Sequence, residues 1–124
     1  MKHCLVVDDS RVVRKVARKI LEELKFDISE AEDGAIALTA CRGQMPDAIL
    51  LDWNMPNMSG IEFTRALRQV APSVPILMVT TRSVREDIMA AIEAGVSNYV
   101  VKPFTPQLLK EKIDAVLAGQ ATAA

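Results

Sequence analysis

The sequence predicts an α/β fold in which helices cover both faces of one doubly wound, five-stranded parallel sheet. Three observations carry this prediction. Strand-like and helix-like patterns alternate five times along the chain, and the loops between them are short. Three of the strand patterns are continuously apolar, which is typical of parallel strands buried on both faces. Ligands of such sheets bind beyond the strand C-termini, and we expect the strand order 2-1-3-4-5 with right-handed crossovers.

Five segments are expected to form the strands: residues 3–7, 27–30, 48–51, 76–79 and 98–101. The first, third and fourth of these are the continuously apolar ones. Residues 27–30 instead alternate polar and apolar side chains, which indicates a half-exposed strand at an edge of the sheet.

Cap signals mark the helices between these strands. The side chains expected to cap helix N-termini are Ser10, Asp33, Ser59, Ser83 and Thr105. Ser59 and Ser83 are each followed three residues later by a glutamate, which completes a capping box. The first helix should run to about residue 24, and Gly43 and Gly95 should end the second and the fourth.

The composition bounds the class of protein. The chain has 124 residues, half of them apolar, and we expect one domain over residues 1–124, with its core at about 2–118 and a short frayed tail. The net charge of -1 does not favour nucleic-acid binding. No apolar run is long enough to span a membrane, and no signal peptide precedes the first strand. Cys4 and Cys41 are too few for a disulfide framework or a zinc site, so we expect buried thiols in a reduced, cytoplasmic protein.

Charged and polar side chains follow four of the apolar runs at the point where each strand should end. They are Asp8 and Asp9, Asp52, Thr80, and Lys102. Because the C-terminal ends of parallel strands meet at one edge of a sheet, three carboxylates, a hydroxyl and an ammonium group should converge in one crevice. Charges just beyond buried strands contribute little to stability, so their convergence indicates a functional site.

The chemistry of these side chains suits phosphoryl transfer. Three neighbouring carboxylates repel one another unless a cation lies between them, and Mg²⁺ or Mn²⁺ suits the site because such ions prefer oxygen ligands. We expect Asp9 to bind the ion directly and Asp8 to act through water. Asp52 can act as a nucleophile toward phosphorus, which would give an acyl phosphate. Lys102 and Thr80 would then stabilise the oxygens of the transferred group.

Four motifs at these positions resemble those of response-regulator receiver domains. They are Val7-Asp8-Asp9-Ser10, Leu51-Asp52-Trp53-Asn54-Met55-Pro56, Val79-Thr80 and Val101-Lys102-Pro103-Phe104. Their spacing also matches the family: 43 residues separate the second and third acids, the threonine follows 28 residues later, and the lysine 22 after that. The resemblance covers about residues 2–118 and implies a flavodoxin-like fold. Trp53, Asn54 and Tyr99 resemble the chemotaxis, or CheY-like, branch in particular.

The resemblance implies a phosphoryl switch. In the family, a phosphohistidine on a histidine kinase or a histidine phosphotransfer protein donates its phosphoryl group to the aspartate that matches Asp52. The residues that match Asp9, Asp52 and the backbone carbonyl of Asn54 hold Mg²⁺, and Asp8 assists through water. Members of the family are not enzymes in the usual sense, although they support their own phosphotransfer and autodephosphorylation.

Further roles follow from the same resemblance. Thr80 matches the switch hydroxyl, and Tyr99 matches an aromatic side chain whose rotamer follows the threonine. Lys102 matches the phosphate-binding lysine, and a cis peptide bond to Pro103 is expected because the family normally has one there.

Three positions around the site are expected to modify this chemistry. Thr81 stands where the family usually has a small residue, so its branched side chain should narrow access to Asp52. Arg82 and Asn54 occupy the two positions at which family members control the lifetime of the acyl phosphate. We expect Arg82 to change that lifetime.

Two surfaces outside the crevice are candidates for protein contacts. Five basic side chains crowd the first two-thirds of the first helix: Arg11, Arg14, Lys15, Arg18 and Lys19. They form either a solvated face near the acidic pocket or a docking surface for the phosphodonor. In the fourth helix, Met89 and Ile92 are expected in the core. This placement leaves Ile88 exposed beside Tyr99 as a candidate output surface.

We therefore expect a stand-alone, monomeric response regulator that signals by phosphorylation-dependent protein binding, with a flagellar motor component as one type of target. Alternatives are a phosphate sink, a relay intermediate and a receiver cut from a longer DNA-binding regulator. A small phosphohydrolase is less well supported, since Asp8-Asp9-Ser10 lacks a D-x-D pattern and the chain has no room for a cap domain. A flavin site is disfavoured because two aspartates after the first strand would repel the flavin phosphate.

Overall fold

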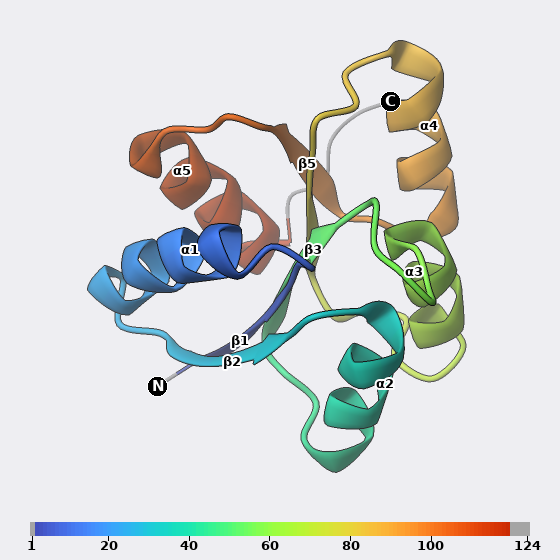
Figure 1. The fold of residues 1–124 in the computed structure, drawn as a ribbon, viewed down its shortest axis with the longest axis horizontal. Helices are drawn as coiled ribbons and strands as arrows, with labels where there is room; N and C mark the ends of the chain where they lie inside the picture. The colour runs from blue at the N-terminus through green and yellow to red at the C-terminus, as the bar shows by residue number, and fades with distance from the viewer. Residues whose placement is uncertain (1, 120–124) are drawn as a thin grey trace.

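Five parallel strands form one sheet, and its order β2-β1-β3-β4-β5 confirms the predicted topology. The computed structural model describes residues 2–119, so the expected fraying of residues 120–124 lies outside the described part (Figure 1). The strands are β1 His3–Val7, β2 Asp27–Ala31, β3 Ala48–Asp52, β4 Ile76–Thr80 and β5 Asn98–Val101. The three middle strands in chain order each run one residue past their predicted end, so Asp52 and Thr80 are themselves the last residues of strands.

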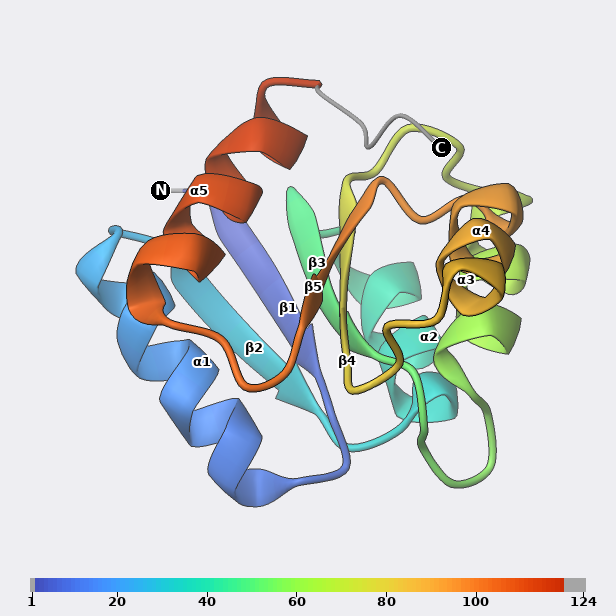
Figure 2. The same ribbon diagram turned by 90° about the horizontal axis from the view of Figure 1, so that it is seen from above.

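Helices cover both faces of the sheet, as predicted. They are α1 Arg11–Glu23, α2 Gly34–Gly43, α3 Gly60–Arg68, α4 Arg85–Ala94 and α5 Pro106–Leu117. α1 and α5 lie on one face, and α2, α3 and α4 lie on the other (Figure 2). The chain leaves β1 for β2 on one side and returns to β3 on the other, so the order of strands reverses between β1 and β3.

Alternating side chains of the strands enter two separate cores. Leu5 and Val7 of β1 pack with the buried side chains of α2 and α3, whereas Cys4 and Val6 pack with those of α1 and α5. Burial on both faces explains why three strands are continuously apolar. Cys4 and Cys41 are buried free thiols, as expected. Across residues 2–119, the helices are too short or too polar to traverse a bilayer.

Most of the predicted helix caps are present. The side chains of Ser10, Asp33, Ser59 and Thr105 each accept a backbone N–H in the first turn of their helix, and Ser59 forms the complete capping box. Gly95 ends α4 at a φ of 116°, a left-handed conformation that glycine adopts without strain.

The predicted capping box at Ser83 is wrong. Val84 occupies the N-cap position of α4, and it makes no side-chain cap hydrogen bond. Glu86 and Asp87 lie in the first turn, where a negative charge interacts favourably with the helix dipole. The N-terminus of α4 is therefore stabilised by charge and lacks a hydroxyl cap.

The predicted orientation of α4 is also wrong. Met89, expected in the core, is 41% exposed, and the buried residues of the helix are Ala91 and Ala94. Ile88 precedes Ala91 by three residues, so it lies on the buried side and is half-buried instead of exposed. Ala91 and Ala94, two small side chains, therefore pack against the rest of the protein where the sequence predicted Met89 and Ile92.

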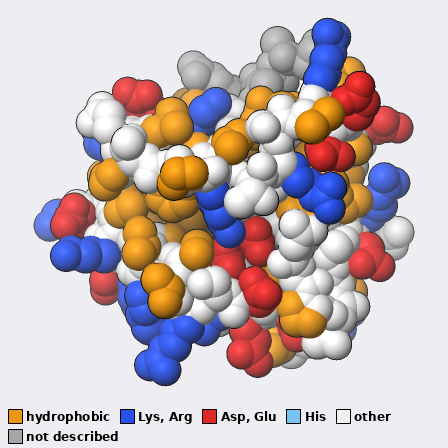
Figure 3. Space-filling model, turned by 45° about the horizontal axis from the view of Figure 1, so that its top comes forward, with side chains coloured by type: hydrophobic (Ala, Val, Ile, Leu, Met, Phe, Trp, Pro, Cys, Tyr) orange, Lys and Arg blue, Asp and Glu red, His pale blue; other side chains and the backbone are white. Residues whose placement is uncertain are grey.

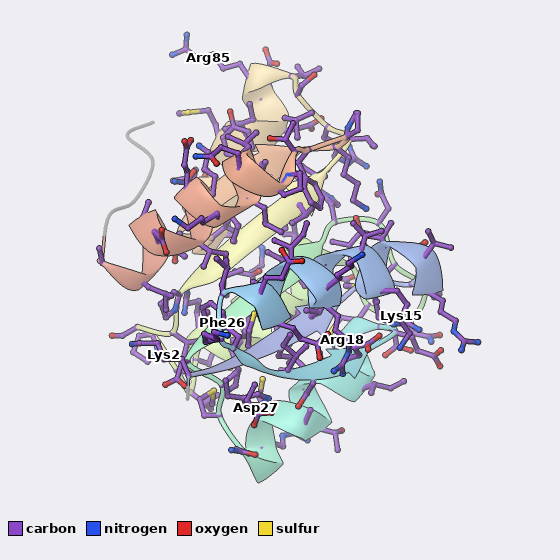
Figure 4. All side chains as sticks on the ribbon, turned by 90° about the vertical axis from the view of Figure 1, so that its left-hand side faces the viewer. Lys2, Lys15, Arg18, Phe26, Asp27 and Arg85 are labelled. Carbon is purple, nitrogen blue, oxygen red and sulfur yellow. The ribbon has the colours of Figure 1, made fainter. Side chains whose placement is uncertain are left out.

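Glu30, on the edge strand β2, binds three of the five basic side chains of α1. Arg14 Nε lies 3.0 Å from Glu30 Oε1, while Lys15 Nζ and Arg18 Nε lie 3.2 and 2.7 Å from Oε2. Figure 4 shows Lys15 and Arg18 on the side of α1 that faces β2. Burial would raise the pKa of Glu30, but hydrogen bonds from these cations outweigh it and lower the pKa to about 2. Three of the five basic side chains of α1 therefore hold the helix against the sheet. Neither the solvated face nor the docking surface considered from the sequence predicted this role.

Replacing Glu30 by Gln should make the protein less stable in a pH-dependent way. The folded-state pKa of about 2 lies below the ordinary glutamate value. The charged carboxylate therefore stabilises the fold above that ordinary value, and this contribution is lost as the pH falls toward 2. We expect a loss of about 1 kcal/mol near pH 7 in urea unfolding, after allowance for solvent screening. The loss should shrink steadily as the pH is lowered below about 4.5.

The control for this measurement is Glu32→Gln, which neutralises an exposed carboxylate just beyond the end of β2. It should change stability little. Equal effects of the two substitutions at every pH would contradict the role of Glu30.

Candidate functional site

Three carboxylates gather where β1 and β3 end. Asp8 and Asp9 directly follow β1, and Asp52 is the last residue of the neighbouring strand β3. One oxygen of each carboxylate lies within 4.8 Å of the other two. Asp8 and Asp52 are 3% and 7% exposed, whereas Asp9 is open to solvent. Acidic side chains gather at the centre of the face in Figure 3, next to basic ones. The three carboxylates therefore converge at the C-terminal edge of the sheet, as predicted.

Lys102 bridges two of these carboxylates. Its Nζ lies 3.0 Å from Asp8 Oδ2 and 3.1 Å from Asp52 Oδ1. Burial alone would lower the pKa of Lys102, but its contacts with the two carboxylates outweigh burial and raise that pKa. Burial and the charge of Asp8 raise the pKa of Asp52, and Lys102 offsets them only in part. One ammonium group therefore contacts two buried carboxylates, and ionisation of Asp52 remains energetically unfavourable.

Backbone contacts hold the loop after β1 in place. Ser10, the N-cap of α1, donates its backbone N–H to Asp8 Oδ1 at 2.9 Å. Arg14 donates from its guanidinium group to the backbone carbonyl of Asp8 at 2.7 Å. Arg14 also binds Glu30, so the cation that ties α1 to β2 also positions this acidic loop.

The loop after β3 is held close to the start of α3. Gly60, the first residue of α3, donates its N–H to the carbonyl of Trp53 at 2.8 Å. A Cβ atom on Gly60 would collide with the backbone carbonyl of Asp52. The glycine thus allows the helix to begin against the strand end, which leaves Asn54 exposed on the intervening loop.

Thr80 and Lys102 lie at the C-terminal ends of the neighbouring strands β4 and β5. Thr80 ends β4 and is 3% exposed, and its Oγ1 accepts a hydrogen bond of 3.0 Å from the backbone N–H of Arg82. Lys102 donates its backbone N–H to the carbonyl of Thr80 at 2.7 Å, and the Lys102–Pro103 peptide bond is cis. Tyr99 is half-buried on β5, with Lys112 Nζ 5.8 Å from the centroid of its ring.

Arg82 and Asn54, the two positions expected to control phosphoryl lifetime, contact each other. A terminal nitrogen of the Arg82 guanidinium donates to Asn54 Oδ1 at 3.2 Å. The guanidinium carbon also lies 4.7 Å from the ring centroid of Trp53, a distance typical of a cation–π interaction. Arg82 therefore covers the loop that follows Asp52.

Thr81 lies on the rim of an apolar groove beside the carboxylates. The groove has a volume of about 350 Å³, and its lining residues are Val12, Val13, Val16, Thr81, Lys102, Pro103 and Phe104. Val12 and Val16 are 72% and 49% exposed. Sequence reasoning missed these two valines, although one signal was available: they are spaced four residues apart on α1, off the stripe that enters the core.

The family model for the response regulator receiver domain matches residues 4–114. The chain belongs to this family. Receiver domains generally act as signalling proteins that take phosphoryl groups from histidine kinases and act on downstream targets, and they typically bind Mg²⁺ at an acidic pocket. The cluster of Asp8, Asp9 and Asp52 fits that ion, because it offers three carboxylate oxygens close together.

Relatives support the same assignment across most of the chain. The chemotaxis protein CheY of Pseudomonas aeruginosa is 44% identical over 115 residues, which cover 90% of this chain and 93% of that protein. The chemotaxis protein CheY1 of Helicobacter pylori is 41% identical over 117 residues, which cover 91% and 94%. Among solved structures, CheY4 of Vibrio cholerae has a TM-score of 0.89 at 34% identity and covers 94% of this chain and 98% of its own. The predicted family and fold are confirmed.

Replacing Asp52 by Asn should stabilise the protein at neutral pH in a metal-free buffer. The pKa of Asp52 is raised in the fold, so its ionised form opposes folding once the pH exceeds the ordinary carboxyl range. Removing the charge leaves Lys102 to serve Asp8 alone. We expect a gain of about 1 kcal/mol at pH 7, which should shrink as the pH falls toward about 4, measured by urea unfolding with EDTA present.

Asp9→Asn is the control for this test, because Asp9 belongs to the same cluster but is exposed. It should stabilise the protein less than Asp52→Asn does. A loss of stability in Asp52→Asn at pH 7 would contradict the electrostatic argument.

Proposed function

We propose that this protein is a phosphoryl-accepting signalling switch in which Asp52 is the acceptor. One observation carries the proposal: the Asp52 carboxylate ends a buried strand between an acidic pair and the ammonium group of Lys102. A carboxylate in that position contributes little to stability, since burial and the charge of Asp8 disfavour its ionised form. Such a position is typical of a reactive group.

The proposed reaction is transfer from a phosphohistidine to a carboxylate. An oxygen of Asp52 forms a bond to phosphorus, and the P–N bond of the donor breaks with its electron pair left on the imidazole nitrogen. The other ring nitrogen of the donor carries a proton during the transfer, so the products are an acyl phosphate on Asp52 and a neutral histidine on the donor. Lys102 orients Asp52 before the reaction, and its ammonium group can then bind the oxygens of the transferred phosphoryl group.

Mg²⁺, or Mn²⁺, would be held by Asp9, Asp52 and the backbone carbonyl of Asn54, with Asp8 acting through water. When bound, the ion neutralises charge on the transferring group. The exposure of Asp9 supports its assignment as the direct ligand, because it leaves room for the water molecules that Mg²⁺ keeps. Asp8 is occupied by Ser10 and Lys102, which favours an indirect role.

The proposed switch passes from Asp52 through Thr80 to Tyr99 and the surface around Ile88. Phosphorylation adds roughly −1.5 to −2 charge and three acceptor oxygens, which the Thr80 hydroxyl can bind. A complete shift between two states needs about 5.5 kcal/mol, more than one hydroxyl contact supplies. Binding of a downstream protein must therefore contribute. Because several relatives are named chemotaxis proteins, we propose a target in chemotaxis, such as a flagellar motor component.

The phosphodonor is proposed to dock on the apolar groove between α1 and the loop after β5. Arg14 and Arg18 are engaged by Glu30, so they are poor candidates for this contact. Val12 and Val16 are exposed beside the carboxylates, and the groove is continuous with Lys102. Figure 3 shows hydrophobic side chains next to the acidic cluster, with basic side chains at their border.

Several finer features of the proposal follow from the same site. The protein would act as a monomer that supports its own phosphotransfer and autodephosphorylation, without turnover of a separate substrate. The free thiols of Cys4 and Cys41 suit a reducing compartment such as the cytoplasm. Rapid return of the phosphoryl group from Asp52 to a histidine protein would instead favour a phosphate sink or a relay intermediate.

Phosphoryl incorporation from a phosphorylated histidine protein should depend on Asp52 and on a divalent ion. The wild type should gain one hydroxylamine-labile phosphoryl group in the presence of Mg²⁺, and EDTA should prevent this. Asp52→Asn should take up none, and Asp9→Asn should react at least about tenfold more slowly, because each 1.4 kcal/mol of lost stabilisation is a factor of ten. The measurement is intact-protein mass spectrometry. Phosphoryl incorporation into Asp52→Asn at the level of the wild type would contradict the proposal.

Val12→Asp should slow transfer from the protein donor and spare transfer from acetyl phosphate. A charge placed at the groove weakens docking, and we expect roughly a tenfold lower rate with the protein donor. Val70→Asp is the matched control: Val70 is 74% exposed, close to the 72% of Val12, but it follows α3 at the opposite edge of the sheet. If Val12→Asp slowed both donors equally, the groove would not be the docking site.

A further inference from the structure

Arg82 makes contacts with three segments around the site. Its backbone N–H donates to Thr80 Oγ1 at 3.0 Å, and its guanidinium group donates to Asn54 Oδ1 at 3.2 Å. The same guanidinium group lies 3.5 Å from Asp87 Oδ2 and stacks over the ring of Trp53. One residue thus connects the end of β4 through its backbone with the loop after Asp52 and the first turn of α4 through its side chain.

The chemistry of arginine suits this arrangement, and one of its donors is left unused. A planar guanidinium group can stack on an indole while its edge donates to an amide and a carboxylate, which an ammonium group cannot do. Among the described residues, however, Arg82 Nε is buried without a hydrogen-bond partner. A buried donor without a partner is unfavourable, so the arrangement persists only while the other contacts of Arg82 hold it.

Movement of Thr80 would act on Arg82 through their hydrogen bond. For the Thr80 hydroxyl to approach a phosphoryl group on Asp52, the backbone N–H of Arg82 must either follow it or lose its hydrogen bond. If the backbone of Arg82 follows Thr80, the base of its side chain moves relative to Trp53 and Asn54, which lie on the segment after β3. Such a movement would strain the stack on Trp53 against the ion pair with Asp87.

The start of α4 is well placed to respond. Its N-cap residue Val84 makes no side-chain hydrogen bond, so the first turn lacks the usual anchor. The ion pair between Asp87 and Arg82 connects this turn to the site. When that pair is lost, the first turn of α4 is free to shift relative to β5.

We infer that Arg82 is a latch that holds the first turn of α4 against the loop after β3 while Asp52 is unphosphorylated, and that its release carries phosphorylation to α4. The inference rests on the proposed function and names the regulation of that site. It differs from a direct role of Arg82 as a cation beside the phosphoryl group, because a latch favours the unphosphorylated state whereas a nearby cation favours the phosphorylated one.

Asp87→Ala separates these two roles, because it cuts the latch at α4 and keeps the positive charge of Arg82. The probe is beryllofluoride with Mg²⁺, which mimics a phosphoryl group on an aspartate. Since the latch favours the unliganded state, removing it should tighten beryllofluoride binding about two- to tenfold. Glu86→Ala is the matched control, since it removes an exposed carboxylate from the same turn of α4. It should leave the affinity within about twofold of the wild type.

Trp53 supplies a direct readout, because it is the only tryptophan of the chain and carries the Arg82 stack. Its emission should change when beryllofluoride binds the wild type. Asp87→Ala without beryllofluoride should already show part of that change, and Glu86→Ala should not. Arg82→Lys, which keeps the charge but loses the planar stack, should resemble Asp87→Ala in both measurements.

The outcomes distinguish the two levels of the proposal. Wild-type binding that Asp52→Asn fails to abolish would overturn the proposed function and the latch with it. A normal wild-type response, with equal affinity and equal Trp53 emission in Asp87→Ala and Glu86→Ala, would overturn the latch alone. Weaker beryllofluoride binding by Asp87→Ala than by Glu86→Ala would also overturn it.

Discussion

The contact of one ammonium group with two buried carboxylates is the interaction on which the rest of the site depends. Lys102 Nζ lies 3.0 Å from Asp8 and 3.1 Å from Asp52, and the two acids approach each other because β1 and β3 are neighbours. Without this cation, two carboxylates at the edge of the sheet would repel each other with little water to screen them. With it, Asp52 still has a raised pKa. The site therefore retains an unbalanced negative charge, which suits a further cation and a reaction at Asp52.

The fold supplies this interaction through contacts on both sides. Lys102 stands just beyond β5, which β4 separates from β3, and its backbone N–H donates to the carbonyl of Thr80. On the other side, Arg14 links the acidic loop to Glu30 on the edge strand β2. Both edges of the sheet thus contribute to the position of groups at its centre. Three of the basic residues of α1 thus take part in the structure through Glu30.

The sequence predicted the strands to within one residue and most helix starts, because continuous apolar runs and cap side chains are local signals. The convergence of Asp8, Asp52 and Lys102 was also predictable, since strand order alone places their ends at one edge. The orientation of α4 and the missing cap at Ser83 were not. They depend on how a short helix packs and on an ion pair with a loop, and neither leaves a periodic pattern in the sequence.

The network around Arg82 shows the same limit. The sequence singled out Arg82 and Asn54 as separate positions, but the bond between them joins residues 28 positions apart. Likewise, the partner of Arg14 lies 16 positions away on an edge strand whose alternating pattern gave no hint of the pairing. Long side chains can reach several partners, so their contacts depend on tertiary structure.

Identification of the phosphorylated residue would show whether Asp52 accepts the phosphoryl group. After transfer from a phosphorylated histidine protein, reduction with borohydride converts an aspartyl phosphate to homoserine, and peptide mass spectrometry locates it. Homoserine at position 52, and at no other aspartate, is the result that the geometry predicts. Homoserine at Asp8 or Asp9 with Asp52 unchanged would contradict it.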